Sequence, residues 1–239
     1  MPKHICLWSG PRNISTTLMY SFAQRKDTKV FDEPLYAHYL SKHPKAKQYH
    51  PEAEAILNTI EHDGNKVMKM LLHHSEKPIY FYKQMIHHLL DLDRKFMTKT
   101  INIILTRNPK EMLPSFDKVI SNPHIDDVGY KLHVNLLNYF KNNTIEYVIL
   151  DSKRVLLNPE EVLKKLCDAV DIPFYKTMLH WDKGARSEDG IWAKHWYSNI
   201  HNSTGFIPYK PKTEPFPNHL KPLLKECQPY YEQLLEEAL

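Results

Sequence analysis

Short apolar runs alternate along the chain with stretches in which apolar positions recur at helical spacing. The runs are too short for helices and predict strands, whereas the stretches between them predict helices. The predicted strands are His4–Trp8, Lys29–Phe31, Ile79–Lys83, Ile101–Thr106 and Glu146–Leu150. The predicted helices are Ser15–Gln24, Pro51–Leu72, Pro109–Ser121, Val128–Lys141 and Pro159–Val170. Strands that alternate with helices are typical of a mostly parallel central sheet with helices on both faces, so we expect an α/β fold built as a three-layer sandwich.

The periodic pattern weakens after Pro173. Lys176–Thr213 is rich in proline and tyrosine and holds the tryptophans Trp181, Trp192 and Trp196. Because tryptophans usually pack against other parts of a protein, we expect a long functional loop region here, followed by a C-terminal helix over residues 217–239. The chain has no internal repeat, so we expect a single domain over residues 1–239.

Composition favours a soluble globular protein, because 42% of the residues are hydrophobic and 25% are charged. The N-terminus has no basic-then-apolar export signal, and no apolar run approaches the ~20 residues that cross a bilayer. We therefore expect a cytoplasmic protein without an integral membrane segment. The formal net charge of +4 is too small to indicate nucleic-acid binding, although it suits a small polyanionic ligand.

The cysteines and histidines do not predict a metal site. Cys6, Cys167 and Cys227 lack the spacing of metal ligands, and they do not indicate a disulfide framework. The two members of an adjacent pair, such as His73-His74 or His87-His88, cannot both point at one ion from a regular helix or strand face.

The segment from Leu7 to Thr17 is the first candidate for a binding site. An apolar run ends there in a turn that contains Arg12, and Ser15, Thr16 and Thr17 then open a predicted helix. Backbone N–H groups at a helix start, together with hydroxyls and a guanidinium, suit a phosphate group. The Gly-x4-Gly-Lys-Ser/Thr signature of nucleotide triphosphatases is absent, so a capped turn without a ligand stays an open alternative.

A second candidate follows the predicted strand Ile101–Thr106. Arg107 stands at the carboxyl end of this strand, and in an open α/β sheet that edge is where ligands bind. Ser115 follows about two helical turns later, where its hydroxyl can complete a shell that the arginine fork begins around a phosphate. Taken alone, the pattern is equally compatible with a surface arginine in front of a helix.

Together, the two segments resemble the nucleotide-binding elements of the sulfotransferase family. Arg107 and Ser115 have the spacing of that family's Arg-x7-Ser element, which binds the 3′-phosphate of 3′-phosphoadenosine 5′-phosphosulfate (PAPS). The residues that match the loop for the 5′-phosphosulfate are Arg12, Asn13, Ile14, Ser15, Thr16 and Thr17. The resemblance implies a P-loop NTPase-like fold and a PAPS-dependent transferase that needs no metal and releases adenosine 3′,5′-bisphosphate (PAP).

The resemblance extends over roughly residues 4 to 173. Phe31–Tyr36 is similar to the Phe-Glu-Pro-Leu segment of carbohydrate sulfotransferases, and Tyr147–Cys167 is similar to the family's strand, Asn-Pro turn and helix. Further on, Gly190–Phe206 resembles the late loop that closes over the nucleotide.

The chain also departs from the cytosolic branch of that family. This branch has a lysine where Arg12 stands, a tryptophan near Thr17 that stacks on adenine, and a histidine two residues after the lysine that matches Lys83. Here that histidine is replaced by Met85. The resemblance therefore identifies neither the residue that stacks on adenine nor the catalytic base.

The cations are expected to act on the leaving group. By the resemblance, Arg12 and Lys83 would stabilise the negative charge that grows on the leaving phosphate oxygen. For Lys83, a surface lysine at a strand end stays the alternative interpretation.

Glu33 is the first candidate for the base that accepts the proton of the acceptor. It follows a short strand, and Pro34 holds it in an extended conformation at the sheet edge. A residue that only forms an ion pair in the turn is the alternative. His87 and His88 are rival bases, and Asp32 is interpreted as a turn residue.

The acceptor is expected to be a hydroxyl or amine of a small molecule, lipid or sugar. Tyr36, Tyr39, Trp192 and Trp196 are candidates for its pocket, although aromatic residues at these spacings more often belong to a core. Two other functions stay open: a P-loop-type phosphotransferase, and a catalytically inactive nucleotide-binding module, for which Met85 is the main argument.

Overall fold

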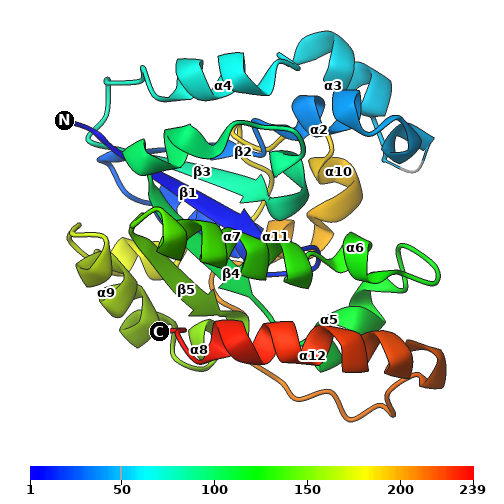
Figure 1. Ribbon diagram of the computed structural model, residues 1–239. Coiled ribbons are helices and arrows are strands. Elements are labelled where there is room, and N and C mark those ends of the chain that lie inside the picture. Colours follow the sequence, from blue (N-terminus) through cyan, green and yellow to red (C-terminus); the bar gives the residue numbers. More distant parts are fainter. Residues whose placement is uncertain (49) are drawn as a thin grey trace.

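A sheet of five parallel strands in the order β2-β3-β1-β4-β5 forms the centre of the computed structural model, which describes residues 1–48 and 50–239 (Figure 1). The strands are β1 (Lys3–Ser9), β2 (Thr28–Asp32), β3 (Ile79–Met85), β4 (Ile101–Thr106) and β5 (Tyr147–Asp151). Each apolar run of the sequence is thus a strand, with ends that differ from the prediction by at most two residues. The expected α/β sandwich is confirmed.

Helices fill the connections between the strands and follow the last one. The α-helices are α1 (Ser15–Ala23), α2 (Tyr36–Lys42), α3 (Ala53–Thr59), α4 (Gly64–Leu71), α5 (Pro109–Phe116), α6 (Ile125–Val128), α7 (Tyr130–Asn142), α8 (Ser152–Leu157), α9 (Pro159–Ala169), α10 (Ala193–Trp196), α11 (Ser198–His201) and α12 (Lys221–Leu235). The 3-10 helices are η1 (Pro44–Gln48), η2 (Ile86–Leu89), η3 (Arg94–Lys99), η4 (Lys176–Leu179) and η5 (Asn218–Leu220).

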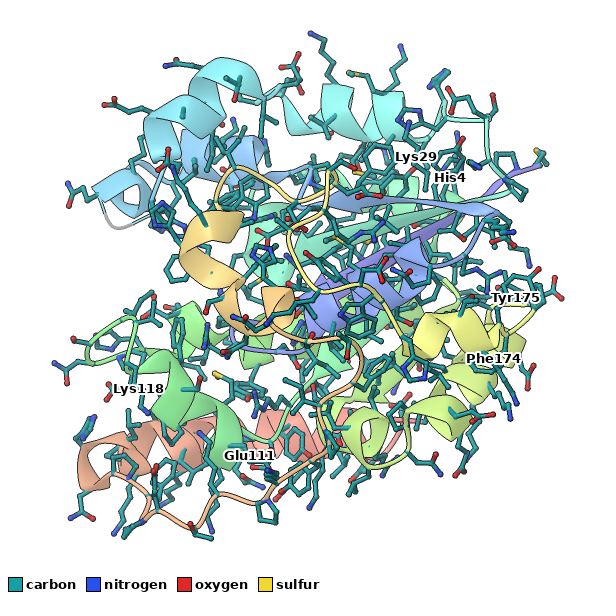
Figure 2. All side chains as sticks on the ribbon, turned by 180° about the vertical axis from the view of Figure 1, so that it is seen from behind. His4, Lys29, Glu111, Lys118, Phe174 and Tyr175 are labelled. Carbon is teal, nitrogen blue, oxygen red and sulfur yellow. The ribbon has the colours of Figure 1, made fainter. Side chains whose placement is uncertain are left out.

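Both faces of the sheet are apolar, because successive residues of a strand point to opposite sides. Ile5 and Leu7 belong to the core shared with α1 and α9, whereas Cys6 and Trp8 belong to the core shared with α4 and α7. In Figure 1, α7 crosses the front of the sheet, and Figure 2, seen from behind, shows α10 and α11 on the other side. The result is the layered arrangement of helices, sheet and helices.

The prediction of one helix over Pro51–Leu72 is wrong. α3 ends at Thr59, and α4 begins after Asp63, whose side chain accepts hydrogen bonds from the backbone N–H groups of Asn65 and Lys66. An aspartate in this position satisfies donors that a helix start leaves free, so it starts a new helix instead of continuing the old one.

Other helices also differ in extent from the prediction. The helix expected over Pro109–Ser121 ends at Phe116, and α8 was not expected. It begins after Asp151, whose carboxylate accepts a hydrogen bond from the N–H of Arg154. Within residues 176–213, expected to be a long loop region, the structure has the short helices η4, α10 and α11.

The carboxyl ends of the strands meet at one edge of the sheet. In the register, Asp32 of β2 pairs with Lys83 of β3, and Ser9 of β1 pairs with Leu105 of β4. Arg12 (φ 51°) and Glu33 (φ 46°) follow β1 and β2 at this edge, and both adopt the left-handed backbone conformation. The extended conformation expected for Glu33 before Pro34 is therefore wrong. Non-glycine residues adopt that conformation at a cost, and such residues cluster at functional sites.

Candidate functional site

A cavity of about 960 Å³ lies at this edge of the sheet. It is bounded by the segments that follow β1, β2, β3 and β4 and by residues between positions 192 and 212. The site residues expected from the sequence all line it: Arg12, Asn13, Ile14, Ser15, Thr16, Thr17, Glu33, Lys83, His87, Arg107 and Ser115. The fold therefore brings into one cavity residues that the sequence spreads over more than a hundred positions.

The loop after β1 is fixed by Asn13. Its side-chain amide donates to the carbonyl of Leu105 at 2.9 Å, and its Oδ1 accepts from the N–H of Ile14 at 3.1 Å and from the hydroxyl of Ser152. These contacts occupy the Asn13 side chain within the protein. The loop leads directly into α1, whose first turn has no side-chain cap. Its backbone N–H groups can therefore bind an anion.

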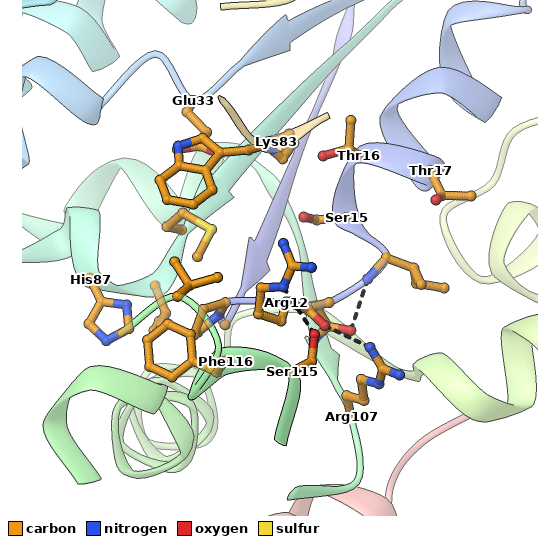
Figure 3. A pocket seen from close by; sticks show the side chains of 18 of the residues that line it. Arg12, Ser15, Thr16, Thr17, Glu33, Lys83, His87, Arg107, Ser115 and Phe116 are labelled. Atoms are coloured by element: carbon orange, nitrogen blue, oxygen red, sulfur yellow. Dashed lines mark hydrogen bonds and ion pairs between the residues drawn. The ribbon is translucent and has the colours of Figure 1, made fainter. Parts of the chain in front are cut away.

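Two guanidinium groups lie beside this loop (Figure 3). Arg12 Nε donates to Ser115 Oγ at 3.2 Å, and Arg107 Nη1 donates to the carbonyl of Arg12 at 2.8 Å. Burial and the neighbouring charge of Arg107 both lower the pKa of the Arg12 guanidinium. Among the described residues, the only salt bridge of Arg107 is with Glu111, with 3.8 Å between Arg107 Nε and Glu111 Oε2. An anion between the two cations relieves their repulsion, so this end of the cavity suits a phosphate.

Lys83 lies at the other end of the drawn residues, above Ser15 in Figure 3. Its Nζ is 2.8 Å from Asp32 Oδ1 and 2.5 Å from Glu33 Oε1, and the residue is only 1% exposed. Burial alone lowers the pKa of an ammonium, but the two carboxylates outweigh it and raise the pKa of Lys83 well above its usual value. Lys83 is therefore a buried cation, which excludes the alternative of a surface lysine.

The two carboxylates beside Lys83 differ in their surroundings. Among the described residues, Glu33 lines the cavity and Asp32 does not. Burial, and then the charge of Asp32, raise the pKa of Glu33, while Lys83 opposes the shift. The interpretation of Asp32 as a turn residue is wrong: it ends β2 and is buried against Lys83.

The rival bases have different partners. His88 Nε2 is 3.8 Å from Glu33 Oε2, and its buried Nδ1 has no hydrogen-bond partner among the described residues. His87 Nε2 lies 2.9 Å from the carbonyl of Asp126. Burial lowers the pKa of both imidazoles, so both are neutral at pH 7. His88 is the imidazole that contacts the Glu33 carboxylate.

Aromatic rings surround His88. The ring of Tyr36 stacks on it at 5.2 Å between centroids, and the ring of Tyr39 lies at 5.3 Å. Both tyrosines line the cavity together with Trp192 and Trp196, as expected for an acceptor pocket from the sequence.

Sequence reasoning missed residues that come from the late part of the chain. Tyr197 Oη lies 2.5 Å from Lys83 Nζ, and Tyr209 Oη donates to Glu111 Oε1 at 2.6 Å. Figure 2 shows Glu111 beside the connection that carries Tyr209 toward α12. Their only sequence signal was membership in an aromatic-rich stretch, which does not identify a partner.

The described residues hold no group of three or more histidine, cysteine, aspartate or glutamate side chains placed to bind a metal ion. Within residues 1–48 and 50–239, no helix has both the length and the apolar character needed to cross a membrane.

Two curated proteins of Arabidopsis thaliana are similar to this chain in sequence. Branched-chain-amino-acid aminotransferase-like proteins 2 and 1 are each 38% identical to it, over 226 and 232 residues. The matches cover 94% and 96% of this chain but only 40% and 41% of those proteins. The chain thus spans about two fifths of the length of these relatives, and their names describe much longer proteins.

Several solved structures share the fold. The sulfotransferase domain from the curacin biosynthetic pathway superposes with a TM-score of 0.62 at 17% identity, covering 100% of this chain and 99% of that one. The sulfotransferase from Alicyclobacillus acidocaldarius gives 0.56 at 12% identity, covering 100% and 97%. Retinol dehydratase in complex with androsterone and PAP gives 0.52 at 11% identity, covering 98% and 81%. At these identities the similarity concerns the fold, which is the P-loop NTPase-like fold of sulfotransferases.

The sequence profile of a family described as "Sulfotransferase domain" matches residues 3–238, nearly the whole chain. The match includes every segment that carries the resemblance, from the loop after β1 to the late loop at α10 and α11. The chain belongs to the sulfotransferase family.

Proposed function

We propose that this chain transfers the sulfuryl group of PAPS to a hydroxyl or amine of a small-molecule, lipid or sugar acceptor. The observation that carries the proposal is that the Arg12, Arg107 and Ser115 cluster faces the same cavity as Glu33 and Lys83. Donor and acceptor must meet in one cavity for a group to pass between them. The PAP in the retinol dehydratase complex, a protein of the same fold, supports a nucleotide of this kind.

One end of the cavity, the arginine end, is formed by Arg12, Arg107, Ser115 and the start of α1, and its residues fit such a nucleotide. The uncapped start of α1, with Ser15, Thr16 and Thr17, would hold the 5′-phosphosulfate. Arg107 and Ser115 would hold the 3′-phosphate. When bound, PAPS supplies the sulfuryl group, and the residues around it must stabilise the negative charge that moves onto the leaving phosphate.

The other end, the lysine end, is formed by Lys83, Glu33 and His88, and its residues fit the chemistry of the acceptor. Glu33 accepts the proton that the acceptor hydroxyl loses, because its carboxylate lines the cavity and its raised pKa makes it a stronger base than an exposed glutamate. Arg12 donates hydrogen bonds to the oxygens on which charge accumulates, and Lys83, whose three N–H groups already donate to Asp32, Glu33 and Tyr197, stabilises that charge electrostatically. His88, neutral and in contact with Glu33, is the second candidate for the base.

An inactive nucleotide-binding module is the alternative. It is favoured by Met85, which lines the cavity where the cytosolic branch has its histidine. The phosphotransferase alternative loses its support, because the chain belongs to the sulfotransferase family.

Ligand-induced stabilisation tests the nucleotide. PAP at a hundred times its dissociation constant should stabilise the protein by about 2.7 kcal/mol, which a thermal-shift measurement detects. Adenosine 5′-monophosphate, which lacks the 3′-phosphate, is the matched control and should stabilise it less. ATP with magnesium should have no larger effect than the monophosphate. A protein that PAP does not stabilise would refute the assignment.

Turnover then separates an enzyme from a binding module. The protein is incubated with PAPS carrying labelled sulfate and with a metabolite extract, and labelled products are identified by mass spectrometry. Formation of a labelled product that requires the intact protein supports the transferase. PAP binding without any labelled product supports the inactive module.

A further inference from the structure

A tyrosine completes the buried charge cluster around Lys83. Tyr197 Oη lies 2.5 Å from Lys83 Nζ, 2.9 Å from each carboxylate oxygen of Asp32 and 3.3 Å from Trp192 Nε1. The ammonium and the indole N–H donate to the phenol oxygen, which donates its own proton to Asp32.

Both carboxylate oxygens of Asp32 accept hydrogen bonds. Besides Lys83 and Tyr197, the backbone N–H of Gly190 donates to its Oδ2 at 3.0 Å. Burial and the charge of Asp32 raise the pKa of Tyr197 well above its usual value, so the phenol keeps its proton and continues to donate.

Glu33 has a different set of neighbours. Its Oε1 accepts from Lys83, while its Oε2 lies nearest to the neutral His88. Tyr36, whose pKa is raised by burial and then by Glu33, is a further neighbour on the cavity side. Glu33 is therefore the carboxylate that can exchange a proton with a ligand, and Asp32 is not.

We propose that Asp32 and Tyr197 are positioning residues that hold the ammonium of Lys83 in place while Glu33 changes its protonation state. The inference rests on the proposed function, in which Glu33 accepts the proton of the acceptor. Once Glu33 is protonated, it no longer balances the charge of Lys83. A buried ammonium without a counter-ion is strongly unfavourable, so a second carboxylate that stays ionised keeps Lys83 charged and at the cavity wall.

The segment that supplies Tyr197 has a second anchor that does not touch Lys83. Tyr20 Oη donates to Asp189 Oδ2 at 2.7 Å, and His201 Nε2 lies 3.0 Å from the same oxygen. Tyr20 is fully buried, as Tyr197 nearly is. Tyr20→Phe thus removes one buried tyrosine-to-aspartate hydrogen bond from the same segment and is a matched control for Tyr197→Phe.

The test measures Lys83 and Glu33 directly and needs no acceptor. The full chain and its Tyr197→Phe, Tyr20→Phe and Asp32→Asn variants are treated with acetic anhydride, and acetylation of Lys83 is followed by peptide mass spectrometry. The titration of Glu33 is followed by ¹³C NMR of glutamate-labelled protein. PAP affinity is measured by calorimetry on every variant.

We expect Tyr197→Phe to raise the rate of Lys83 acetylation by about tenfold or more, as for the loss of a hydrogen bond to a charged group, and Tyr20→Phe to leave it near the wild-type rate. In Asp32→Asn, the pKa of Glu33 should fall, because the negative charge of Asp32, which raises this pKa, is removed while the positive charge of Lys83 remains. PAP affinity should stay within about twofold in Tyr20→Phe, whose hydrogen bond to Asp189 touches neither Lys83 nor the arginine end.

Equal acetylation of Lys83 in the Tyr197→Phe and Tyr20→Phe variants would overturn the role of Tyr197. An unchanged Glu33 titration in Asp32→Asn would overturn the role of Asp32. This second test does not depend on Tyr197→Phe, so the proposal can be refuted even if that variant does not fold. A wild-type protein that does not bind PAP would instead refute the proposed function, since neither the acetylation nor the titration depends on the nucleotide.

Discussion

The two ends of the cavity handle charge in opposite ways. At the arginine end, Arg12 and Arg107 are partly exposed, and Arg12 forms no salt bridge within the described residues. At the lysine end, Lys83 is buried against two carboxylates and a phenol before any ligand arrives. The first end needs the charge of a ligand to complete it, whereas the second is complete by itself. Substitutions at the arginine end should therefore weaken nucleotide binding, and substitutions at the lysine end should affect turnover and stability.

The largest effect is expected for Lys83→Met. It leaves Asp32 and Glu33 together in a buried place without their cation, so the variant should lose turnover and about 3–5 kcal/mol of the free energy of unfolding. Urea denaturation measures this loss. Lys164→Met, which breaks an exposed ion pair with Glu160, is the control and should cost about 0.5 kcal/mol or less. Similar losses in both variants would mean that the buried ion pairs of Lys83 contribute no more to the free energy of unfolding than an exposed ion pair.

Glu33→Gln should separate chemistry from structure within the lysine end. Turnover should fall roughly 100- to 10,000-fold, the usual contribution of a general base. Stability should change little, because Asp32 still balances Lys83. Steady-state kinetics checks the turnover and urea denaturation checks the stability, with Glu160→Gln on α9 as control. Full activity of Glu33→Gln would transfer the role of base to His88 or His87.

Arg107→Ala should affect the arginine end alone. The loss of a charged hydrogen-bonding group costs about 1.5–3 kcal/mol, so PAP should bind roughly 10- to 150-fold more weakly. The affinity for adenosine 5′-monophosphate should change much less, which calorimetry with both nucleotides detects. Arg154→Ala on α8, outside the cavity, should leave both affinities unchanged. An equal loss for the two nucleotides would argue against a 3′-phosphate at Arg107.

The smallest effect, over the first pH unit below 6.5, concerns a histidine beneath the loop after β1. His133 lies next to Gly10, at the start of this loop. Burial, and then the charge of His87, lower the pKa of His133 to about 3. Above pH 6.5, the ordinary pKa of histidine, His133 binds a proton in neither the folded nor the unfolded state. As the pH falls below that value, only the unfolded state gains the proton, so stability falls by about 1.4 kcal/mol per pH unit.

Urea unfolding at a series of pH values checks this prediction. The His133→Asn variant should show a shallower pH dependence than the wild type, although its stability at neutral pH is lower. An identical slope in the two proteins would show that His133 does not carry the effect.

The parts of the molecule that could be predicted from the sequence depend on local pattern. The strands follow from short apolar runs, and the spacing of Arg107 and Ser115 follows from one strand and the helix after it. The split between α3 and α4 was missed because the pattern of apolar positions continues through it, while a single capping aspartate starts a new helix.

The lysine end could be predicted only in part, because its partners are distant along the chain. Asp32 and Lys83 are 51 positions apart, and Lys83 and Tyr197 are 114 apart. Nothing next to Tyr197 in the sequence distinguishes it from the other aromatic residues of its stretch. Its partner is determined by the strand order and by the path of the late segment over the sheet edge.

The left-handed turns at Arg12 and Glu33 have a consequence for engineering. Glycine adopts this conformation freely, whereas each of these residues bears a local cost of about 1–3 kcal/mol. Replacing either with glycine would ease the backbone and at the same time delete a guanidinium or a carboxylate from the cavity. Variants selected only for heat resistance are therefore expected to accumulate glycine at these two turns and to become stable proteins without catalysis.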